Sequence, residues 1–229
     1  MLEYKEICSV KSNGQETDMK KGLIFDMDGT LWDSSENVAK SWNEAVKRTG
    51  YSRDTISKED IMAVMGKTMD AIADILFVDF DKNSRMEILQ ACCNYENDFL
   101  RQHGGVLYED LEATLKKLKQ KYHLYIVSNC QSGYIEAFLE YYNFGAYFED
   151  IECYGNNLKS KGQNIRLLAS RNNLDEAYYI GDIKADYDAT MEAGYNFIHA
   201  AYGFGKLDVD VPRLESFKVL PELLKELGY

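Results

Sequence analysis

The motif Asp26-Met27-Asp28-Gly29-Thr30 constrains this chain more than any other feature of its sequence. It follows directly on residues 22–25 (Gly-Leu-Ile-Phe), a short apolar run whose length and composition predict a buried parallel strand. In open α/β sheets, ligands bind at the carboxyl ends of the strands, so both aspartates are expected at a binding site. At average residue usage, Asp-x-Asp-Gly-Thr arises by chance roughly once in 10⁵ positions. An acidic turn that merely caps a strand is therefore the weaker interpretation.

Other apolar runs of similar length predict further parallel strands. They lie at residues 123–128, 177–182 and 196–200, with a weaker candidate at 147–153. Segments with helical periodicity separate them, such as residues 111–118. Strands that alternate with helices of this length are typical of right-handed βαβ crossovers. We therefore predict an α/β fold with a Rossmann-like parallel sheet.

Residues 34–105 interrupt the alternation, because apolar residues there repeat at helical spacing and no convincing strand is found. This block predicts an α-helical cap subdomain inserted directly after the first strand. The catalytic core would then consist of residues 20–33 and 106–229, with Gly104-Gly105 as a hinge on the return path. Residues 1–19 are polar and unpatterned, and we assign them only as an N-terminal extension of unknown role.

Charge and composition exclude several classes of protein. The chain has 229 residues and a net charge of −12, which repels nucleic acids and anionic membranes, so we expect neither as a partner. No apolar run approaches the roughly 20 residues that span a bilayer. The N-terminus lacks the pattern of a secretory signal, and five cysteines without a Cys-x-x-Cys pair suggest reduced thiols. We therefore expect a cytoplasmic protein, without predicting whether it is a monomer or a homodimer.

Two more carboxylates follow another predicted strand, as Gly181-Asp182 and then Asp186. Alone, they could serve as the N-cap and a first-turn acid of a helix. Together with Asp26 they would repel one another at one sheet edge unless a cation lay among them. Hard oxygen ligands suit Mg²⁺, and the three histidines lack the spacing of a zinc site. The sequence therefore predicts a magnesium site.

A third strand ends at Ser128-Asn129, where a hydroxyl and the following backbone N–H groups can bind an oxyanion. The same dipeptide is also common in ordinary turns. Lys161 follows a Gly/Asn-rich loop and precedes a helix, so it is a candidate cation for the site. Lys159 is its rival, and the sequence does not decide between them.

In their order and spacing these segments resemble the haloacid dehalogenase superfamily, and specifically its Asp-x-Asp phosphatases. The resemblance covers about residues 20–228, and the helical insert resembles the cap of phosphoglycolate phosphatase-like members. The matching positions are Asp26 and Asp28, Ser128, Lys161, Gly181, Asp182 and Asp186. Two positions depart from the family pattern. Lys161 is followed by Gly162 where proline is usual, and Ile183 stands where serine or threonine is more common.

The resemblance implies roles for these residues. Asp26 would attack phosphorus as the nucleophile, and Asp28 would act as general acid and base. Mg²⁺ would be bound by Asp26, the backbone carbonyl of Asp28 and Asp182, with Asp186 binding through water or orienting the others. Ser128, Asn129 and Lys161 would hold phosphoryl oxygens. Thr30 is included among the substrate-binding candidates, although it is expected to position Asp28 more than to touch the substrate. Lys67, in a loop of the cap, would meet a polar group of the substrate.

The predicted function is thus Mg²⁺-dependent hydrolysis of a small-molecule phosphate monoester through an aspartyl-phosphate. A dehalogenase or a phosphonatase would not need Asp28. A β-phosphoglucomutase-like sugar phosphomutase remains an alternative, although Val38 stands where such mutases typically carry a histidine. A non-catalytic, ligand-binding member of the fold is a second alternative. Phosphoglycolate, a sugar phosphate and a nucleotide all remain open as substrates.

Overall fold

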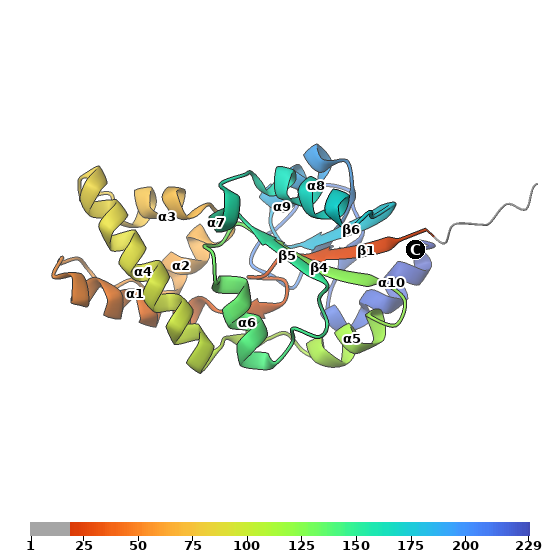
Figure 1. Ribbon diagram of the computed structural model, residues 1–229, viewed down its shortest axis with the longest axis horizontal. Coiled ribbons are helices and arrows are strands. Elements are labelled where there is room, and N and C mark those ends of the chain that lie inside the picture. Colours follow the sequence, from red (N-terminus) through yellow and green to blue (C-terminus); the bar gives the residue numbers. More distant parts are fainter. Residues whose placement is uncertain (1–18) are drawn as a thin grey trace, which may run out of the picture.

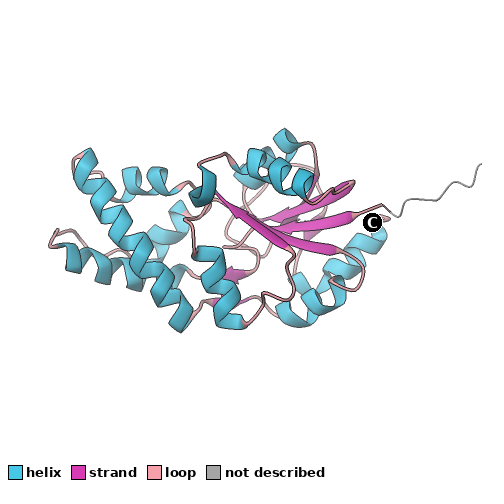
Figure 2. Cartoon of the chain, in the orientation of Figure 1, coloured by secondary structure: helices cyan, strands magenta, loops and turns pink. Residues whose placement is uncertain are grey.

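Short runs of buried apolar residues form the central sheet of the computed structural model, which describes residues 19–229. Its strands are β1 (Lys21–Phe25), β4 (His123–Ser128), β5 (Asp150–Cys153), β6 (Glu176–Gly181), β7 (Asn196–Ala200) and β8 (Arg213–Leu214). The six strands lie in the order β5-β4-β1-β6-β7-β8, and all neighbours run parallel (Figures 1 and 2). The predicted α/β fold with a Rossmann-like parallel sheet is confirmed.

Helices cover both faces of this sheet, because successive side chains of a buried strand point to opposite sides. Leu23 and Phe25 belong to one apolar cluster, whereas Ile24 between them belongs to the other. Figure 1 shows α8 and α9 on one face and α5, α6 and α10 on the opposite face. The bounds of the core helices are α5 (Leu111–Leu118), α6 (Tyr134–Tyr142), α7 (Tyr154–Asn157), α8 (Lys161–Arg171), α9 (Lys184–Ala193), the 3₁₀ helix Phe217–Val219 and α10 (Leu220–Glu226).

We refer to residues 34–105 as the cap segment. It consists of the helices α1 (Ser35–Thr49), α2 (Lys58–Val64), α3 (Met69–Leu76) and α4 (Lys82–His103). The two chain crossings between this segment and the sheet pair with each other as short antiparallel strands, β2 (Trp32–Asp33) and β3 (Val106–Leu107). Helix α4 also packs against α6 of the core, so the cap segment lies beyond one end of the sheet (Figure 1).

Two details of the sheet differ from the prediction. The weak strand predicted at residues 147–153 is shorter, because Tyr147 N–H donates to the Phe144 carbonyl in a turn and pairing begins only at Asp150. Strand β8 was not predicted, because its two residues are too few to show a periodic pattern. Both differences lie away from the sheet edge that carries the motif residues.

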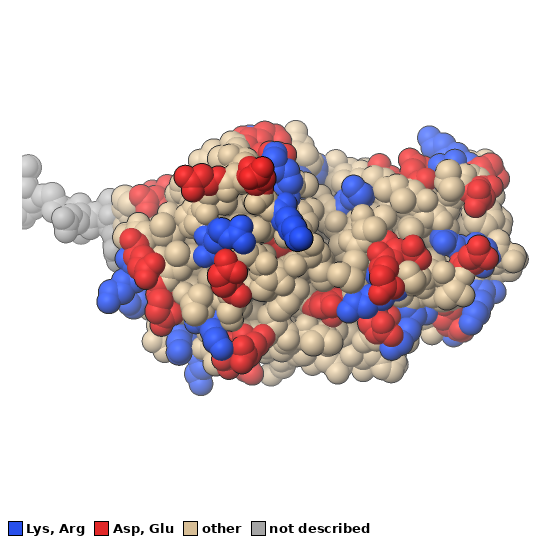
Figure 3. Space-filling model, turned by 180° about the vertical axis from the view of Figure 1, so that it is seen from behind, with Lys and Arg blue, Asp and Glu red and all other residues tan. Residues whose placement is uncertain are grey.

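The surface carries charges of both signs. Figure 3 shows Lys and Arg interspersed with Asp and Glu over the face it displays, without a large basic area. In the described part of the chain, no helix combines the length and the apolar character needed to cross a membrane. These observations give no sign of a nucleic-acid or membrane partner, and the expectation that both are absent stays a prediction.

Candidate active site

The motif residues meet at one edge of the sheet because β4, β1 and β6 are neighbours that end side by side. Asp26 directly follows β1, Ser128 ends β4, and Asp182 directly follows β6. The backbone N–H of Asp26 still donates to the carbonyl of Ile180 at 2.9 Å, so β1 and β6 are paired up to the start of the Asp26-Met27-Asp28 motif. Residues far apart in the sequence therefore lie together without any loop having to place them.

Three carboxylates form a cluster at this edge. Asp26, Asp182 and Asp186 are all buried, and one oxygen of each lies within 4.8 Å of the others. Gly29 makes this packing possible: it has a φ of +83°, and a Cβ there would lie 2.2 Å from Asp182 Oδ2. The motif glycine is thus required for its conformation and for the space that it leaves to Asp182.

Lys161 is the cation of this cluster. Its Nζ lies 3.0 Å from Asp26 Oδ1 and 2.5 Å from Asp186 Oδ1, and its side chain is only 4% exposed. It is the first residue of α8, where the Ser160 side chain accepts from Gln163 N–H and fixes the helix start. Lys159, by contrast, is exposed. Of the two lysines that the sequence left open, the structure brings Lys161 to the carboxylates.

The oxygens of the three aspartates are engaged to different degrees. Asp186 Oδ1 binds Lys161, and its Oδ2 accepts the backbone N–H groups of Asp182 and Ile183 at 3.1 and 3.2 Å. Asp182 Oδ2 accepts Phe204 N–H at 2.7 Å. Asp26 uses Oδ1 for Lys161. Among the described residues, Asp26 Oδ2 and Asp182 Oδ1 accept no hydrogen bond, whereas both oxygens of Asp186 do.

The protonation of the cluster reflects burial and crowding. Burial raises the pKa of Asp26 to about 6, although Lys161 opposes the rise and Asp186 adds to it. Burial raises the pKa of Asp182 to about 8, and the neighbouring charges of Asp186 and Asp26 add to the effect. One lysine therefore does not neutralise the cluster. Free carboxylate oxygens from two aspartates in a site short of positive charge are a donor set that fits a hard divalent cation.

Asp28 has a separate environment, outside the carboxylate cluster. Its Oδ1 accepts the Ser34 hydroxyl at 2.6 Å, and the Tyr134 hydroxyl lies 2.8 and 3.0 Å from its two oxygens. Burial raises the pKa of Asp28 to about 7, while the hydrogen bonds from Ser34 and Tyr134 lower it. A carboxyl group with such a pKa can both give and take a proton near neutral pH.

The Thr30 hydroxyl makes no hydrogen bond to Asp28, so its expected role in positioning that side chain stays a prediction. The Thr30 hydroxyl is buried and has no hydrogen-bond partner among the described residues, whereas its carbonyl accepts from the Tyr202 hydroxyl at 2.8 Å. Ser34 and Tyr134 hydrogen-bond to Asp28. Tyr134 lies 106 residues away in the sequence, on α6, and only the tertiary structure brings it to the motif.

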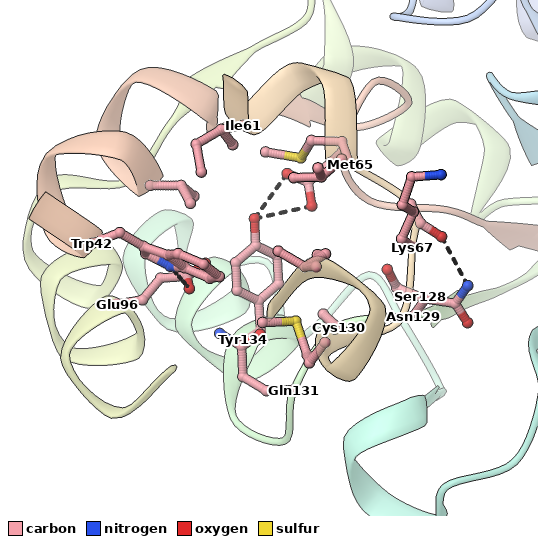
Figure 4. Close-up of a pocket in the computed structure, with 16 residues that line it drawn as sticks. Trp42, Ile61, Met65, Lys67, Glu96, Ser128, Asn129, Cys130, Gln131 and Tyr134 are labelled. Carbon is pink, nitrogen blue, oxygen red and sulfur yellow. Dashed lines mark hydrogen bonds between the residues drawn. The ribbon is translucent and has the colours of Figure 1, made fainter. Parts of the chain in front are cut away.

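A pocket with a cavity volume of about 50 Å³ lies between this sheet edge and the cap segment. The predicted residues Asp28, Lys67, Ser128 and Asn129 line it. Lys67 is exposed, and Asn129 Nδ2 donates to the Gly66 carbonyl of the cap segment at 2.9 Å (Figure 4). Asn129 thus links the core to the cap segment, and its contact with a substrate stays a proposal, as does that of Lys67.

Sequence reasoning missed four polar residues near Asp28 and the pocket: Ser34, Glu96, Gln131 and Tyr134. A signal existed for Glu96, because it interrupts an otherwise apolar helical stripe that runs through Cys92, Cys93 and Leu100. A buried carboxyl group on such a stripe is unusual and points to a specific environment. No comparable signal marked Ser34, Gln131 or Tyr134.

Comparison with known proteins places the chain in a family. The profile of the haloacid dehalogenase-like hydrolase family matches residues 23–200, so the chain belongs to this family. A phosphoglycolate phosphatase of Aquifex aeolicus is 27% identical over 199 residues, which cover 83% of this chain and 89% of that protein. A pyrophosphatase of Bacillus velezensis is 26% identical over 179 residues, covering 75% of this chain and 79% of that protein.

Solved structures agree on the fold. A structure described as a predicted phosphoglycolate phosphatase of Haemophilus somnus superimposes with a TM-score of 0.76 at 21% identity. The match covers 89% of this chain and 97% of that one. The membership that the sequence resemblance predicted is confirmed, and the chain is an enzyme of the phosphatase class within the family.

Proposed function

We propose that this enzyme is a Mg²⁺-dependent phosphatase that hydrolyses a small-molecule phosphate monoester through an aspartyl-phosphate on Asp26. The observation that carries the proposal is that hydrogen bonds engage both oxygens of Asp186 but only one oxygen of Asp26. Lys161 and two backbone N–H groups occupy both oxygens of Asp186, whereas Asp26 keeps Oδ2 for phosphorus or a metal ion. One aspartate is thereby held as a structural anion, and another keeps an oxygen for chemistry.

In the first step, a carboxylate oxygen of Asp26 forms a bond to phosphorus while the bond from phosphorus to the leaving oxygen breaks. Asp28 gives its proton to that oxygen, which a carboxyl group with a pKa of about 7 can do at neutral pH. In the second step, Asp28 takes a proton from water as the water oxygen attacks phosphorus. Inorganic phosphate leaves, and the Asp26 carboxylate is restored.

The remaining groups hold the phosphoryl oxygens and the metal ion. We assign the Lys161 ammonium and the Ser128 hydroxyl to the phosphoryl oxygens, since both lie at the same sheet edge as Asp26. Asp26, Asp182 and the backbone carbonyl of Asp28 would bind Mg²⁺, with Asp186 orienting its neighbours. When bound, the ion supplies positive charge to the transferring phosphoryl group.

Hydrolysis of p-nitrophenyl phosphate tests this proposal directly. We expect release of inorganic phosphate that requires Mg²⁺ and stops when a chelator is added. Asp182→Asn should raise the Mg²⁺ concentration needed for half-maximal activity about tenfold or more, since it weakens a direct ligand. Asp188→Asn is the matched control on the same stretch of chain, because Asp188 is exposed and pairs only with Lys184.

Acid quenching during turnover, followed by peptide mass spectrometry, should find one phosphoryl group on the peptide that contains Asp26. Metal-independent hydrolysis, or a phosphoryl group on another residue, would contradict the proposal. A complete lack of turnover with retained ester binding would instead favour a non-catalytic member of the fold.

The structure gives no support to the mutase alternative. Val38, at the position of the histidine typical of such mutases, is a buried apolar residue of the pocket wall. We expect a sugar 1-phosphate to yield inorganic phosphate and not an isomeric sugar phosphate.

We further propose that the enzyme works in the cytoplasm, as a monomer or a homodimer. The described cysteines, Cys92, Cys93, Cys130 and Cys153, are buried free thiols, which suits a reducing compartment.

A further inference from the structure

The wall of the pocket beyond the reacting groups is largely apolar. Cap helices and the loop after α2 supply most of it, through Val38, Trp42, Ile61, Val64, Met65, Met69 and Ile72. The proposed nucleophile Asp26 and Lys161 do not line this pocket, whereas Asp28 and Ser128 of the same sheet edge do. A phosphate ester bound at that edge would therefore direct its leaving group into this apolar space.

One buried carboxyl group of the cap segment lines the pocket. Glu96 lines the pocket from α4, is 3% exposed, and accepts a hydrogen bond from Trp42 Nε1 at 2.5 Å. No lysine or arginine in residues 19–229 forms an ion pair with it. Burial raises its pKa to about 8, the charge of Asp28 adds to the rise, and hydrogen bonds from Trp42 and Gln131 oppose it. At neutral pH the Glu96 carboxyl group is therefore mostly uncharged.

Positive charge is found only at the opposite end of the pocket. Lys67 is the sole basic residue among the described residues that line it. Figure 4 shows Lys67 beside Ser128 and Asn129, with its ammonium pointing away from Glu96 and Trp42. The lining thus provides one cation, beside Ser128 and Asn129, and none beside Glu96 and Trp42.

We propose that this pocket selects phosphate monoesters whose leaving group is uncharged, with an apolar carbon skeleton and a hydroxyl group that hydrogen-bonds to Glu96. The inference rests on the proposed phosphatase function and names its substrate class. A carboxylate on the leaving group would be desolvated among apolar side chains beside Asp28 and Glu96, where no basic residue lines the pocket to compensate. Phosphoglycolate, the substrate in the names of several relatives, is therefore a poor substrate of this enzyme.

Three esters that share a two-carbon skeleton test the proposal by charge alone. Phosphoglycolate carries a carboxylate, 2-hydroxyethyl phosphate a hydroxyl group, and 2-aminoethyl phosphate an ammonium group. We expect kcat/KM to be highest for the hydroxyethyl ester and lower for phosphoglycolate by about tenfold or more. Phosphoglycolate as the equal or better substrate would overturn the proposal, and so would a preference for the aminoethyl ester, which would indicate an ionised Glu96.

Variants of the pocket wall test whether its charge, and not its shape, sets the order of kcat/KM among the three esters. Glu96→Gln is an uncharged replacement of similar size, so it should keep the order of the three esters. Met65→Lys adds a cation at a half-buried position of the wall and should shift the ratio of kcat/KM values toward phosphoglycolate about tenfold. Met62→Lys is the matched control, because Met62 is also half-buried but does not line the pocket. An unchanged ratio in Met65→Lys would contradict the proposal.

Ester binding to a variant without the nucleophile tests the substrate class separately from the phosphatase function. If the wild-type enzyme does not hydrolyse p-nitrophenyl phosphate, the proposed phosphatase function is contradicted, but the proposed substrate class is not. Calorimetric titration of Asp26→Asn with the three esters, in the presence of Mg²⁺, measures selection without turnover. We expect the hydroxyethyl ester to bind more tightly than phosphoglycolate by about tenfold, and the reverse order would overturn the substrate class whatever the outcome of the hydrolysis assay.

Discussion

The carboxylate cluster at the sheet edge and the cap end of the pocket hold charge in opposite ways. At the sheet edge, Asp26, Asp182, Asp186 and Lys161 are concentrated in a small buried volume, which suits a dianionic phosphoryl group only when a divalent cation joins them. At the cap end, apolar side chains surround a single carboxyl group, Glu96, whose pKa is raised to about 8 by burial. The comparison suggests that the core provides the reaction and the cap segment provides the choice of leaving group.

Removal of the nucleophile should have the largest effect. Asp26→Asn should lower kcat at least about a thousandfold, because no other group can form the covalent intermediate. Steady-state hydrolysis of p-nitrophenyl phosphate measures it, and an unchanged circular dichroism spectrum shows that the variant is folded. Substantial activity in this variant would contradict the proposal that the reaction takes place at the carboxylate cluster.

Loss of the buried cation should have the next largest effect. Lys161→Met should lower kcat/KM by about a hundredfold to a thousandfold, through lost stabilisation of phosphoryl charge. It should also lower the free energy of unfolding by roughly 3–5 kcal/mol without Mg²⁺, because two buried carboxylates lose their partner.

Kinetic assays and urea denaturation measure both effects of this change. Lys159→Met is the matched control and should change neither quantity, since Lys159 is exposed. Equal effects of the two substitutions would contradict the assignment of Lys161.

Removal of the Tyr134 hydroxyl, which contacts Asp28, should have an intermediate effect on kcat. Tyr134→Phe should lower kcat about tenfold and move the alkaline limb of the pH profile of kcat/KM to higher pH. The reason is that the Tyr134 hydroxyl favours the ionised form of Asp28, whose pKa of about 7 should rise without it. Tyr142→Phe is the control, because its hydroxyl bonds only to the Gly105 backbone. An unchanged profile in Tyr134→Phe would show that Tyr134 does not act on Asp28.

The last effect concerns stability at the cap end, where it accumulates with pH. Glu96 has a folded-state pKa of about 8, raised from 4.5, so its contribution is complete below pH 4.5 and is lost as the pH rises toward 8. The wild-type free energy of unfolding should therefore fall, relative to that of Glu96→Gln, by up to about 1.4 kcal/mol per pH unit in this window.

Urea denaturation of both proteins across the window measures this difference. Glu87→Gln, at an exposed position of the same helix, should show no such trend. Parallel stability curves for wild type and Glu96→Gln would mean that Glu96 stays ionised, and the cap end would then not be an uncharged environment.

The sequence by itself determined the fold class, the positions of the main strands along the chain and the identity of the carboxylates. Parallel strands end at a common edge, so Asp26, Ser128 and Asp182 had to converge once each was placed at the end of a strand. The insertion of helices at residues 34–105 was equally readable, because helical periodicity is a local property of the chain.

Only the tertiary structure decided which side chains meet across elements. It placed Lys161 on the carboxylates and left Lys159 exposed, because the turn into α8 sets the direction of each side chain. It brought Ser34 and Tyr134 to Asp28, and it turned Glu96 toward the pocket. Such contacts depend on the packing of distant helices, and a local pattern records which face of a helix is buried but not what it is buried against.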